Sequence, residues 1–259
     1  MLLPETAIDS WRQWDGGFRT RPVILGSLSG GRSNRSFLLE SDGKKLVLRL
    51  NSTDSSLAGI SRNIERDIWK AASQQGIAPP LLFADKNNRF LVSPYIDNSL
   101  PSQPPFDKAF TRQAFELLKR CHRLDVDAPA IDYFSHVEHY WQIIENKGQL
   151  SNRSLTDQHG PMQSTLESLI ASNPPTGLCH HDPVVANFVG DTDRLYLVDW
   201  EYAARGLVVM DYAALGIEWG MDKEMVLAQT GLEPDLLARA GEVYRYLCDL
   251  WQEATSLDA

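Results

Sequence analysis

The sequence has little of what marks several large classes of protein. It contains only three cysteines among its 259 residues, Cys121, Cys179 and Cys248, and they lie far apart. An odd number of widely spaced cysteines argues against a disulfide framework and against a clustered metal site, so we expect buried free thiols. The chain also has no internal repeat and no low-complexity tract, which argues against a solenoid or other repeat architecture.

Long apolar runs are absent as well. No stretch approaches the length needed to cross a bilayer. The N-terminal residues MLLPETAIDSWRQWD begin with a short apolar run but lack the basic region and the long apolar core of a signal peptide. We therefore expect a cytoplasmic protein with no membrane partner. Because 43% of the residues are hydrophobic, the chain can bury a sizeable core in one large domain or in two lobes.

An excess of positive charge is also lacking. The net charge of −9 would repel a phosphate backbone, and no basic stripe offsets it, so nucleic acid is not an expected partner. Residues 199–259 contain 12 acidic and 4 basic residues, a net charge of −8, so nearly all of the net negative charge lies in this segment. These carboxylates either form solvated helix faces or provide a field that concentrates a cationic substrate.

The first part of the chain has the pattern of an antiparallel sheet. Alternating apolar residues predict strands in the segments PVILGSL, SFLLES and KKLVLRL, which are residues 22–28, 36–41 and 44–50. Asp42 and Gly43 between the last two segments are a hairpin signal. Residues 61–75 have helical apolar spacing, and a glycine follows them, which predicts a helix. Two short strands at 81–88 and 89–96 complete a five-stranded lobe with one helix.

The second part of the chain is mostly helical by its apolar spacing. Residues 97–105, DNSLPSQPP, concentrate proline, serine and asparagine, so we place a boundary between lobes of residues 1–97 and 98–259. Helices are predicted in three segments before Gly177 and again from about Val208 to the end; the three segments are 106–124, 134–147 and 159–172. Two short strands around the turn GDTD interrupt the helices. The expected fold class is α+β with two lobes.

The most informative stretch is HHDPVVAN, residues 180–187, followed twelve residues after its asparagine by an aspartate. Phosphoryl transfer needs an acid beside the acceptor hydroxyl and oxygen ligands for the magnesium of the nucleotide. Asp182 would accept the proton of the hydroxyl, and Asn187 and Asp199 would hold the metal. We assign His180, which opens the same loop, to the catalytic residues together with Asp182. The alternative is that these are unrelated polar residues of loops.

Upstream residues follow in the order that a nucleotide site requires. The segment LSGGRSN lies between two predicted strands, and its glycine amides could close over phosphates; a plain hairpin loop is the alternative. The members that we assign to the site are Ser29, Gly30, Gly31, Ser33 and Asn34. Arg49 lies on the third strand, on the face opposite Leu46, Leu48 and Leu50. It could pair with phosphates and with Glu65, unless both are ordinary surface residues.

Aromatic residues recur near the C-terminus at helical spacing. Tyr244, Cys248 and Trp251 share one helical face, and Trp219 follows Glu218 in another apolar segment. Aromatic faces hold an ammonium group at about 0.5–2 kcal/mol each, and a carboxylate adds attraction. The alternative is that these side chains are helix-packing core.

These motifs together resemble the aminoglycoside phosphotransferase and choline kinase superfamily, whose members are relatives of protein kinases. The resemblance runs over nearly the whole chain, from LSGGRSN through VLRL, GIAPPLLF and LCHHDPVVAN to VDWEYA and DYAALGIEW. It is greatest to choline and ethanolamine kinases, and the DWEYA run also occurs in bacterial thiamine kinases. The resemblance implies a protein-kinase-like fold, ATP and Mg²⁺ as cofactors, and a small hydroxyl compound as acceptor.

The resemblance also implies several residue roles. It places Pro94, Tyr95 and Ile96 with the nucleotide, and it makes Glu201, Glu218, Trp219 and Trp251 candidate substrate residues. His122 matches a Leu-His pair at a helix end and is expected to make a structural hydrogen bond. Two departures stand out, because His181 lies between His180 and Asp182, and Cys248 occupies a position where choline kinases tend to have tryptophan.

The leading hypothesis is an ATP-dependent kinase of a small cationic metabolite, with choline or ethanolamine first and thiamine second. An aminoglycoside phosphotransferase is a further alternative, since its substrates are also cationic. A rival of another class is a catalytically silent nucleotide-binding module. Retention of all three residues Asp182, Asn187 and Asp199 argues against a silent module. The oligomeric state does not follow from the sequence.

Overall fold

The computed structural model describes residues 2–28, 34–52, 61–97, 106–146, 148, 150, 152–191 and 193–256. It contains two compact units. The first comprises Met1–Ser102 and Ala186–Tyr202, and the second comprises Gln103–Val185 and Ala203–Ala259. The predicted boundary at residues 97 and 98 lies close to the first division. The first unit also takes in the later segment 186–202, because that segment packs on the N-terminal residues.

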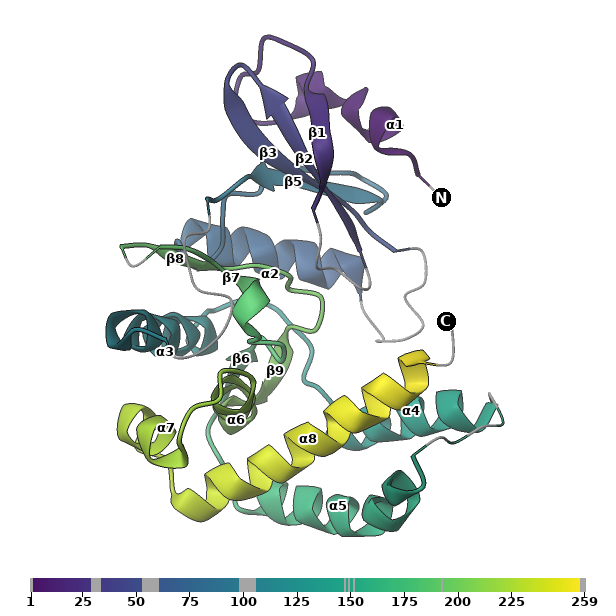
Figure 1. Ribbon diagram of the computed structural model, residues 1–259, viewed down its shortest axis with the longest axis vertical. Helices are drawn as coiled ribbons and strands as arrows, with labels where there is room; N and C mark the ends of the chain where they lie inside the picture. The colour runs from purple at the N-terminus through teal and green to yellow at the C-terminus, as the bar shows by residue number, and fades with distance from the viewer. Residues whose placement is uncertain are drawn as a thin grey trace. The chain divides into compact units, whose positions relative to one another are not determined.

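The first unit is built around one antiparallel sheet, which confirms the predicted five strands (Figure 1). The strand order is β1-β2-β3-β5-β4. The strands are β1 (Val23–Leu28), β2 (Arg35–Ser41), β3 (Lys44–Leu50), β4 (Phe83–Ala84) and β5 (Phe90–Pro94). The turn between β2 and β3 uses Asp42 and Gly43, whose φ angles are 52° and 72°. Two successive positive φ angles match the right-handed twist of a tight hairpin, which is why an Asp-Gly pair is favoured there.

The two faces of this sheet differ in character. Leu46, Leu48 and Leu50 of β3 are buried in one hydrophobic cluster with apolar side chains from α1 (Pro4–Ile8) and η1 (Trp11–Gln13). These two helices were not predicted, because one or two turns are too short to show helical periodicity. The predicted helix is α2 (Arg62–Gln74), and Arg49 pairs with a side chain on it. Strand alternation therefore separates an apolar face from a face that carries charge.

The segment 186–202 adds a small hairpin to the first unit. The 3₁₀ helix η2 (Val185–Asn187) leads into β7 (Phe188–Gly190), which pairs with β8 (Leu195–Leu197). The Leu197 N–H donates to the carbonyl of Ile77, which follows α2, at 2.8 Å. This backbone bond ties the hairpin to the helix of the N-terminal lobe.

The second unit is mainly helical, as predicted. Its helices are α3 (Lys108–His122), α4 (Tyr133–Asn146), α5 (Ser154–Ala171), α6 (Val208–Glu218), α7 (Lys223–Thr230) and α8 (Pro234–Ser256). A two-stranded sheet of β6 (Thr176–Cys179) and β9 (Ala204–Leu207) was not predicted as a pair. Its strands have four residues each and are separated by 24 residues, so the sequence gives little sign that they pair.

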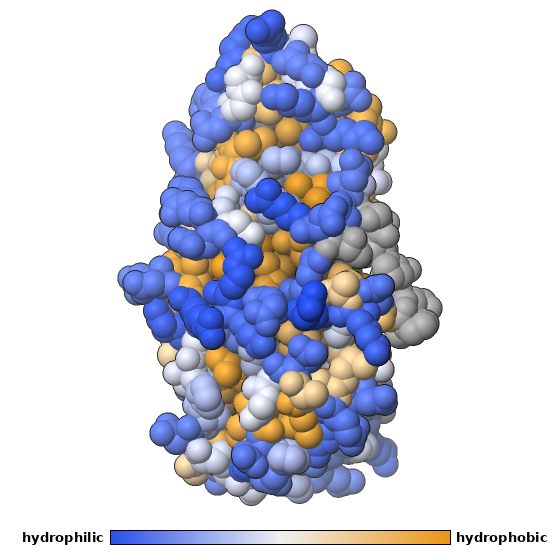
Figure 2. All heavy atoms as spheres, turned by 90° about the vertical axis from the view of Figure 1, so that its left-hand side faces the viewer, coloured by the Kyte–Doolittle hydropathy of each residue, from blue (hydrophilic) through white to orange (hydrophobic). Residues whose placement is uncertain are grey.

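The long helix α8 crosses α4 and α5 (Figure 1), and the three helices share a hydrophobic core. Within the described residues, no helix is both long enough and apolar enough to span a membrane. Figure 2 shows hydrophilic side chains over most of the face drawn, with apolar side chains in separate patches between them. All three cysteines are free thiols, and Cys121 and Cys179 are buried.

Candidate active site

The loop that carries Asp182 begins where β6 ends, and a single carboxylate holds its backbone. The N–H groups of His180 and His181 donate to the two oxygens of Asp211, each at 2.8 Å. His180 is fully buried, whereas Asp182 is half-buried. A carboxylate that accepts two consecutive backbone donors fixes the direction of the chain at that point. Asp182 therefore follows directly after an anchored pair of residues.

A third hydrogen bond, from a histidine side chain, also holds the Asp211 carboxylate. Asp211 is fully buried on α6, and the Nε2 atom of His122 lies 2.9 Å from its Oδ2 atom. Burial alone would raise the pKa of Asp211, but the hydrogen bond and charge of His122 and the backbone donors outweigh burial and lower the pKa to about 2. The predicted structural hydrogen bond of His122 is thus confirmed. Asp211 was not among the predicted site residues, although an aspartate inside the apolar helix VVMDYAALGIE is a signal.

Trp219 supports the other side of the same loop. Its side chain is only 1% exposed, and its Nε1–H donates to the carbonyl of Pro183 at 3.1 Å. Its ring packs on Phe106 and Phe110, with centroids 4.9 and 4.8 Å away. Trp219 is therefore enclosed by other aromatic rings, and it contacts the residue that follows Asp182.

Acidic and polar side chains gather near the C-terminal end of α6. The Tyr244 hydroxyl donates to Oε1 of Glu218, an exposed residue, at 2.9 Å. The pKa of the half-buried Cys248 thiol is raised to about 11, first by burial and then by the negative charges of Glu218 and Asp182, among others. The negative charges of both carboxylates therefore act on the Cys248 position of α8. Trp251, also on α8, packs against the hydrophobic cluster of α4, α5 and α8.

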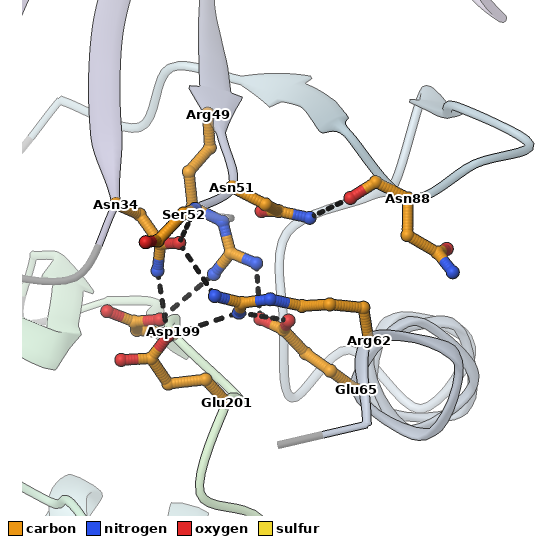
Figure 3. A network of polar contacts seen from close by, with 9 residues as sticks. All are labelled: Asn34, Arg49, Asn51, Ser52, Arg62, Glu65, Asn88, Asp199 and Glu201. Carbon is orange, nitrogen blue, oxygen red and sulfur yellow. Dashed lines mark hydrogen bonds and ion pairs between the residues drawn. The ribbon is translucent and has the colours of Figure 1, made fainter. Parts of the chain in front are cut away.

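In the first unit, a network of ion pairs surrounds Arg49 (Figure 3). Arg49 is buried, forms a short ion pair with Glu65, and donates to Oδ1 of Asp199 at 2.9 Å. Burial alone would lower the pKa of Arg49, but the charges of Glu65 and Asp199 outweigh burial and raise it. Burial would likewise raise the pKa of Glu65, whereas Arg49 and Arg62 together lower it. Arg49 and Glu65 therefore both stay charged at neutral pH.

Arg62 forms a second centre in this network (Figure 3). Its guanidinium donates to Glu65 at 2.8 Å, to Glu201 at 3.1 Å and to the Asn34 side-chain oxygen at 3.1 Å. The Asn34 amide in turn donates to Glu201 at 2.8 Å. The predicted substrate residue Glu201 thus lies among the residues predicted for the nucleotide. The sequence analysis did not single out Arg62, because its partners lie at positions 34, 65 and 201.

The chemistry of Asn187 and Asp199 fits a magnesium ion. Mg²⁺ prefers oxygen ligands, and the two side chains offer an amide and a carboxylate oxygen. A backbone hydrogen bond of 3.0 Å from Val198 N–H to the Asn187 carbonyl joins the two segments. Asp199 has a φ of 67°, and its side chain is 30% exposed. A left-handed conformation is costly for a residue other than glycine, and such residues are more common at functional sites.

The remaining predicted residues lie at the edge of the first sheet or outside the described residues. Pro94 ends β5 opposite Leu46, and the Tyr95 N–H donates to the Lys45 carbonyl at 3.0 Å. Ile96 follows and is half-buried. The predicted phosphate-loop residues Ser29, Gly30, Gly31 and Ser33 lie outside the described residues.

Comparison with known proteins identifies the family. The sequence profile described as the phosphotransferase enzyme family matches residues 25–247, which is most of the chain. The chain belongs to this family. The predicted resemblance is therefore confirmed, and the match includes residues of both units.

Individual proteins are also similar to this chain. Protein LicA of Haemophilus influenzae is 27% identical over 203 residues, which are 75% of this chain and 58% of LicA. Choline kinase LicA from Streptococcus pneumoniae has a TM-score of 0.74 at 21% identity, over 91% of this chain and 88% of that one. A structure of LicA in complex with AMP has a TM-score of 0.76 at 19% identity, over 98% and 89%. These two structures show a shared fold.

Proposed function

We propose that this protein is an ATP-dependent kinase that transfers the γ-phosphate of ATP to a hydroxyl group of a small cationic metabolite, as choline and ethanolamine kinases do. The observation that carries the proposal is the rigidly held loop of Asp182, whose two preceding N–H groups are bound by Asp211. A general base must have a fixed position to act on one hydroxyl group. The names of the LicA relatives and the AMP complex of one of them support the same activity.

In this proposal the residues of the first unit bind the nucleotide. Arg49 has two partners, Glu65 and Asp199, and a phosphate could take the place of one of them. Asn187 and Asp199 would hold Mg²⁺, which neutralises phosphate charge when MgATP is bound. Pro94, Tyr95 and Ile96 would contact the nucleotide, as would the loop of Ser29, Gly30, Gly31, Ser33 and Asn34.

Asp182 would take the proton of the acceptor. Its carboxylate orients the hydroxyl group, and the hydroxyl proton moves to it as the oxygen forms its bond to phosphorus and the bond between phosphorus and the leaving oxygen of ADP breaks. The chain therefore contributes orientation and a proton acceptor, and His180 contributes its backbone N–H to the anchor that holds the loop.

A cation suits the surroundings of Asp182 in the second unit. Glu218 and Asp182 both raise the pKa of Cys248, so their negative charges act on a common region. Glu218 is exposed and held by Tyr244, and a carboxylate near the acceptor would favour an ammonium group by direct attraction. We also propose Trp219 and Trp251 as contributors to acceptor specificity, with Trp219 acting through Pro183. Glu201 would act from the network around Arg62.

The experiment is a phosphate-transfer assay with purified protein, MgATP and a panel of hydroxyl compounds. The panel contains choline, ethanolamine, thiamine and an aminoglycoside, and each is paired with a neutral isostere where one exists, such as 3,3-dimethylbutan-1-ol for choline. We expect phosphorylation of one small cation and at least about tenfold less of its neutral partner, since a contact ion pair near a surface is worth a few kcal/mol before desolvation.

Each other outcome of the panel has a definite meaning. Equal use of charged and neutral compounds would end the cationic-acceptor proposal and leave a kinase of another alcohol. Transfer to the aminoglycoside alone would make the protein an antibiotic phosphotransferase. Binding of MgATP without transfer to any compound, and without slow hydrolysis, would favour a catalytically silent nucleotide-binding module.

A further inference from the structure

The second histidine of the catalytic loop, His181, has a backbone conformation that needs support. Its φ is 62°, in the left-handed region, which is unfavourable for a residue other than glycine. Its backbone N–H donates to Asp211, as described above. Its ring is held separately, because the Nε2 atom lies 3.1 Å from the Tyr133 hydroxyl, and the two rings meet edge to face with centroids 5.9 Å apart. The residue before Asp182 is thus fixed through both its backbone and its side chain.

Tyr133 connects this ring to the β6–β9 sheet. The hydroxyl oxygen accepts a hydrogen bond from the N–H of Leu207, at the end of β9, at 3.0 Å. The hydroxyl can make a second hydrogen bond, and the Nε2 atom of His181 is its partner; the ring tautomer decides which of the two donates. Burial raises the pKa of Tyr133, which keeps the phenol protonated as this arrangement requires.

A glycine on β9 makes the approach possible. A Cβ atom on Gly206 would lie 2.6 Å from the Tyr133 hydroxyl oxygen and 2.7 Å from Nε2 of His181. Both distances are shorter than a non-bonded contact allows, so a side chain here would push the two groups away. Gly177 pairs with Gly206 in the sheet, and a Cβ atom there would lie 2.4 Å from the carbonyl oxygen of His122. The absence of a side chain on Gly206 therefore leaves room for the Tyr133 hydroxyl and the His181 ring, and its absence on Gly177 leaves room for the His122 carbonyl.

We propose that His181 is a positioning residue for Asp182. Tyr133 and Gly206 form the site that holds its ring, and we call this site the seat of His181. This inference rests on the proposed function, which gives Asp182 its role. The seat joins the start of α4, the end of β9 and the loop after β6, and Asp211 adds α6. His181 does not need to touch the substrate in order to act. It holds the Cα of the next residue in place, so that the Asp182 carboxylate is presented in one direction.

The kinetics of five single variants and one double variant test the seat. His181→Gly removes the ring while tolerating the positive φ, and Tyr133→Phe removes only the hydroxyl. We expect each to lower kcat about tenfold or more while KM for ATP changes less than about twofold, because misplacement of a reacting group by about an ångström can cost about a hundredfold. His181→Gln offers an amide oxygen to the Tyr133 hydroxyl and should recover kcat to within about threefold of the parent.

Gly206→Ala should lower kcat at least as much as His181→Gly, through the steric conflict described above. Gly160→Ala is the matched control, because a Cβ on this α5 glycine would meet nothing within 4 Å, and its kinetics should equal those of the parent.

The double variant of His181→Gly with Tyr133→Phe should be no slower than the slower single variant, since both single changes remove the same contact. Additive losses, or a kcat of His181→Gly equal to the parent value, would overturn the proposal.

A nitrogen NMR measurement of the imidazole separates failure of this inference from failure of the proposed function. In the parent protein we expect the Nε2 resonance of His181 to carry a hydrogen-bond shift that is lost in Tyr133→Phe. An Nε2 resonance that is the same in the parent and in Tyr133→Phe would overturn the seat whatever the enzyme does. If the shift is lost as expected but no compound in the panel is phosphorylated, the seat stands and the kinase proposal fails.

Discussion

The two polar centres of the molecule are built by different kinds of bond. Around Arg49 and Arg62, side-chain cations face side-chain carboxylates, and every ion pair joins two side chains. Around Asp211, one carboxylate receives consecutive backbone N–H groups and a histidine from the end of a helix. The first centre can exchange partners by rotating side chains. The second cannot change without moving the chain.

This difference matches what the two centres would have to do. A nucleotide brings its own negative charge and a metal ion, so the residues that bind it must give up some of their existing partners. A general base gains nothing from rearrangement, since the rate depends on its position relative to the hydroxyl. Adjustable ion pairs therefore suit the nucleotide residues, and a fixed backbone anchor suits Asp182. The predictions below test each half of this comparison.

The largest effect is expected at the end of the fixed loop. Asp182→Asn keeps the side-chain volume but removes the proton acceptor, so kcat should fall about 10²- to 10⁴-fold, the range typical of a general base. The thermal unfolding temperature should stay within a few degrees of the parent, because Asp182 is half-buried and is not the anchor of the loop. A turnover within threefold of the parent would remove Asp182 from this role.

The second prediction concerns the anchor itself. Because the folded-state pKa of Asp211 is lowered from 3.8 to about 2, its ionised form stabilises the fold by about 2 kcal/mol above pH 4, and this contribution is lost as the pH falls from about 4 to about 2. Asp211→Asn should therefore lower the free energy of unfolding most at neutral pH. The difference from the parent should shrink towards pH 2 in urea unfolding followed by tryptophan fluorescence.

The matched control for the anchor is Glu242→Gln, an exposed carboxylate on α8. Its unfolding free energy should follow that of the parent at every pH. The opposite outcome is a difference in unfolding free energy between Asp211→Asn and the parent that is constant from pH 2 to pH 7. The lowered pKa of Asp211 would then not contribute to stability.

The third prediction tests the adjustable centre. Arg49→Ala should raise KM for ATP about tenfold, equivalent to about 1.4 kcal/mol, and should change KM for the acceptor much less. Arg49→Lys keeps the charge but cannot bond Glu65 and Asp199 at once with a planar fork, so it should be intermediate. Equal effects on both Michaelis constants would place Arg49 outside the nucleotide site.

The smallest effect is expected at the exposed carboxylate of the second unit. Glu218→Gln should raise KM for the cationic acceptor about threefold to tenfold, the modest range of a solvent-accessible ion pair, and should spare ATP. Raising the salt concentration should weaken acceptor binding in the parent more than in the variant. Glu242→Gln, with the same change of charge, serves again as the control. If both variants behaved alike, only the general negative field would matter.

Much of the fold and the family followed from local patterns. Strand alternation placed Arg49 on the face opposite Leu46, Leu48 and Leu50, and the structure has that arrangement because successive side chains of a strand point to opposite faces. The hairpin of Asp42 and Gly43 and the helix before Gly76 were likewise readable, since turn chemistry and helix ends depend on residues close in sequence.

The sequence by itself indicated the chemistry that we propose, because HHDPVVAN and the later Asp199 carry the residue types that it needs in one short stretch. Only the tertiary structure showed which residues hold this stretch in place. Asp211 reaches His180 across 31 positions, Tyr133 reaches His181 across 48, and Arg62 reaches Glu201 across 139. No local pattern encodes such pairs, because a hydrogen bond depends on distance in space, and folding alone brings these distant segments within about 3 Å of each other.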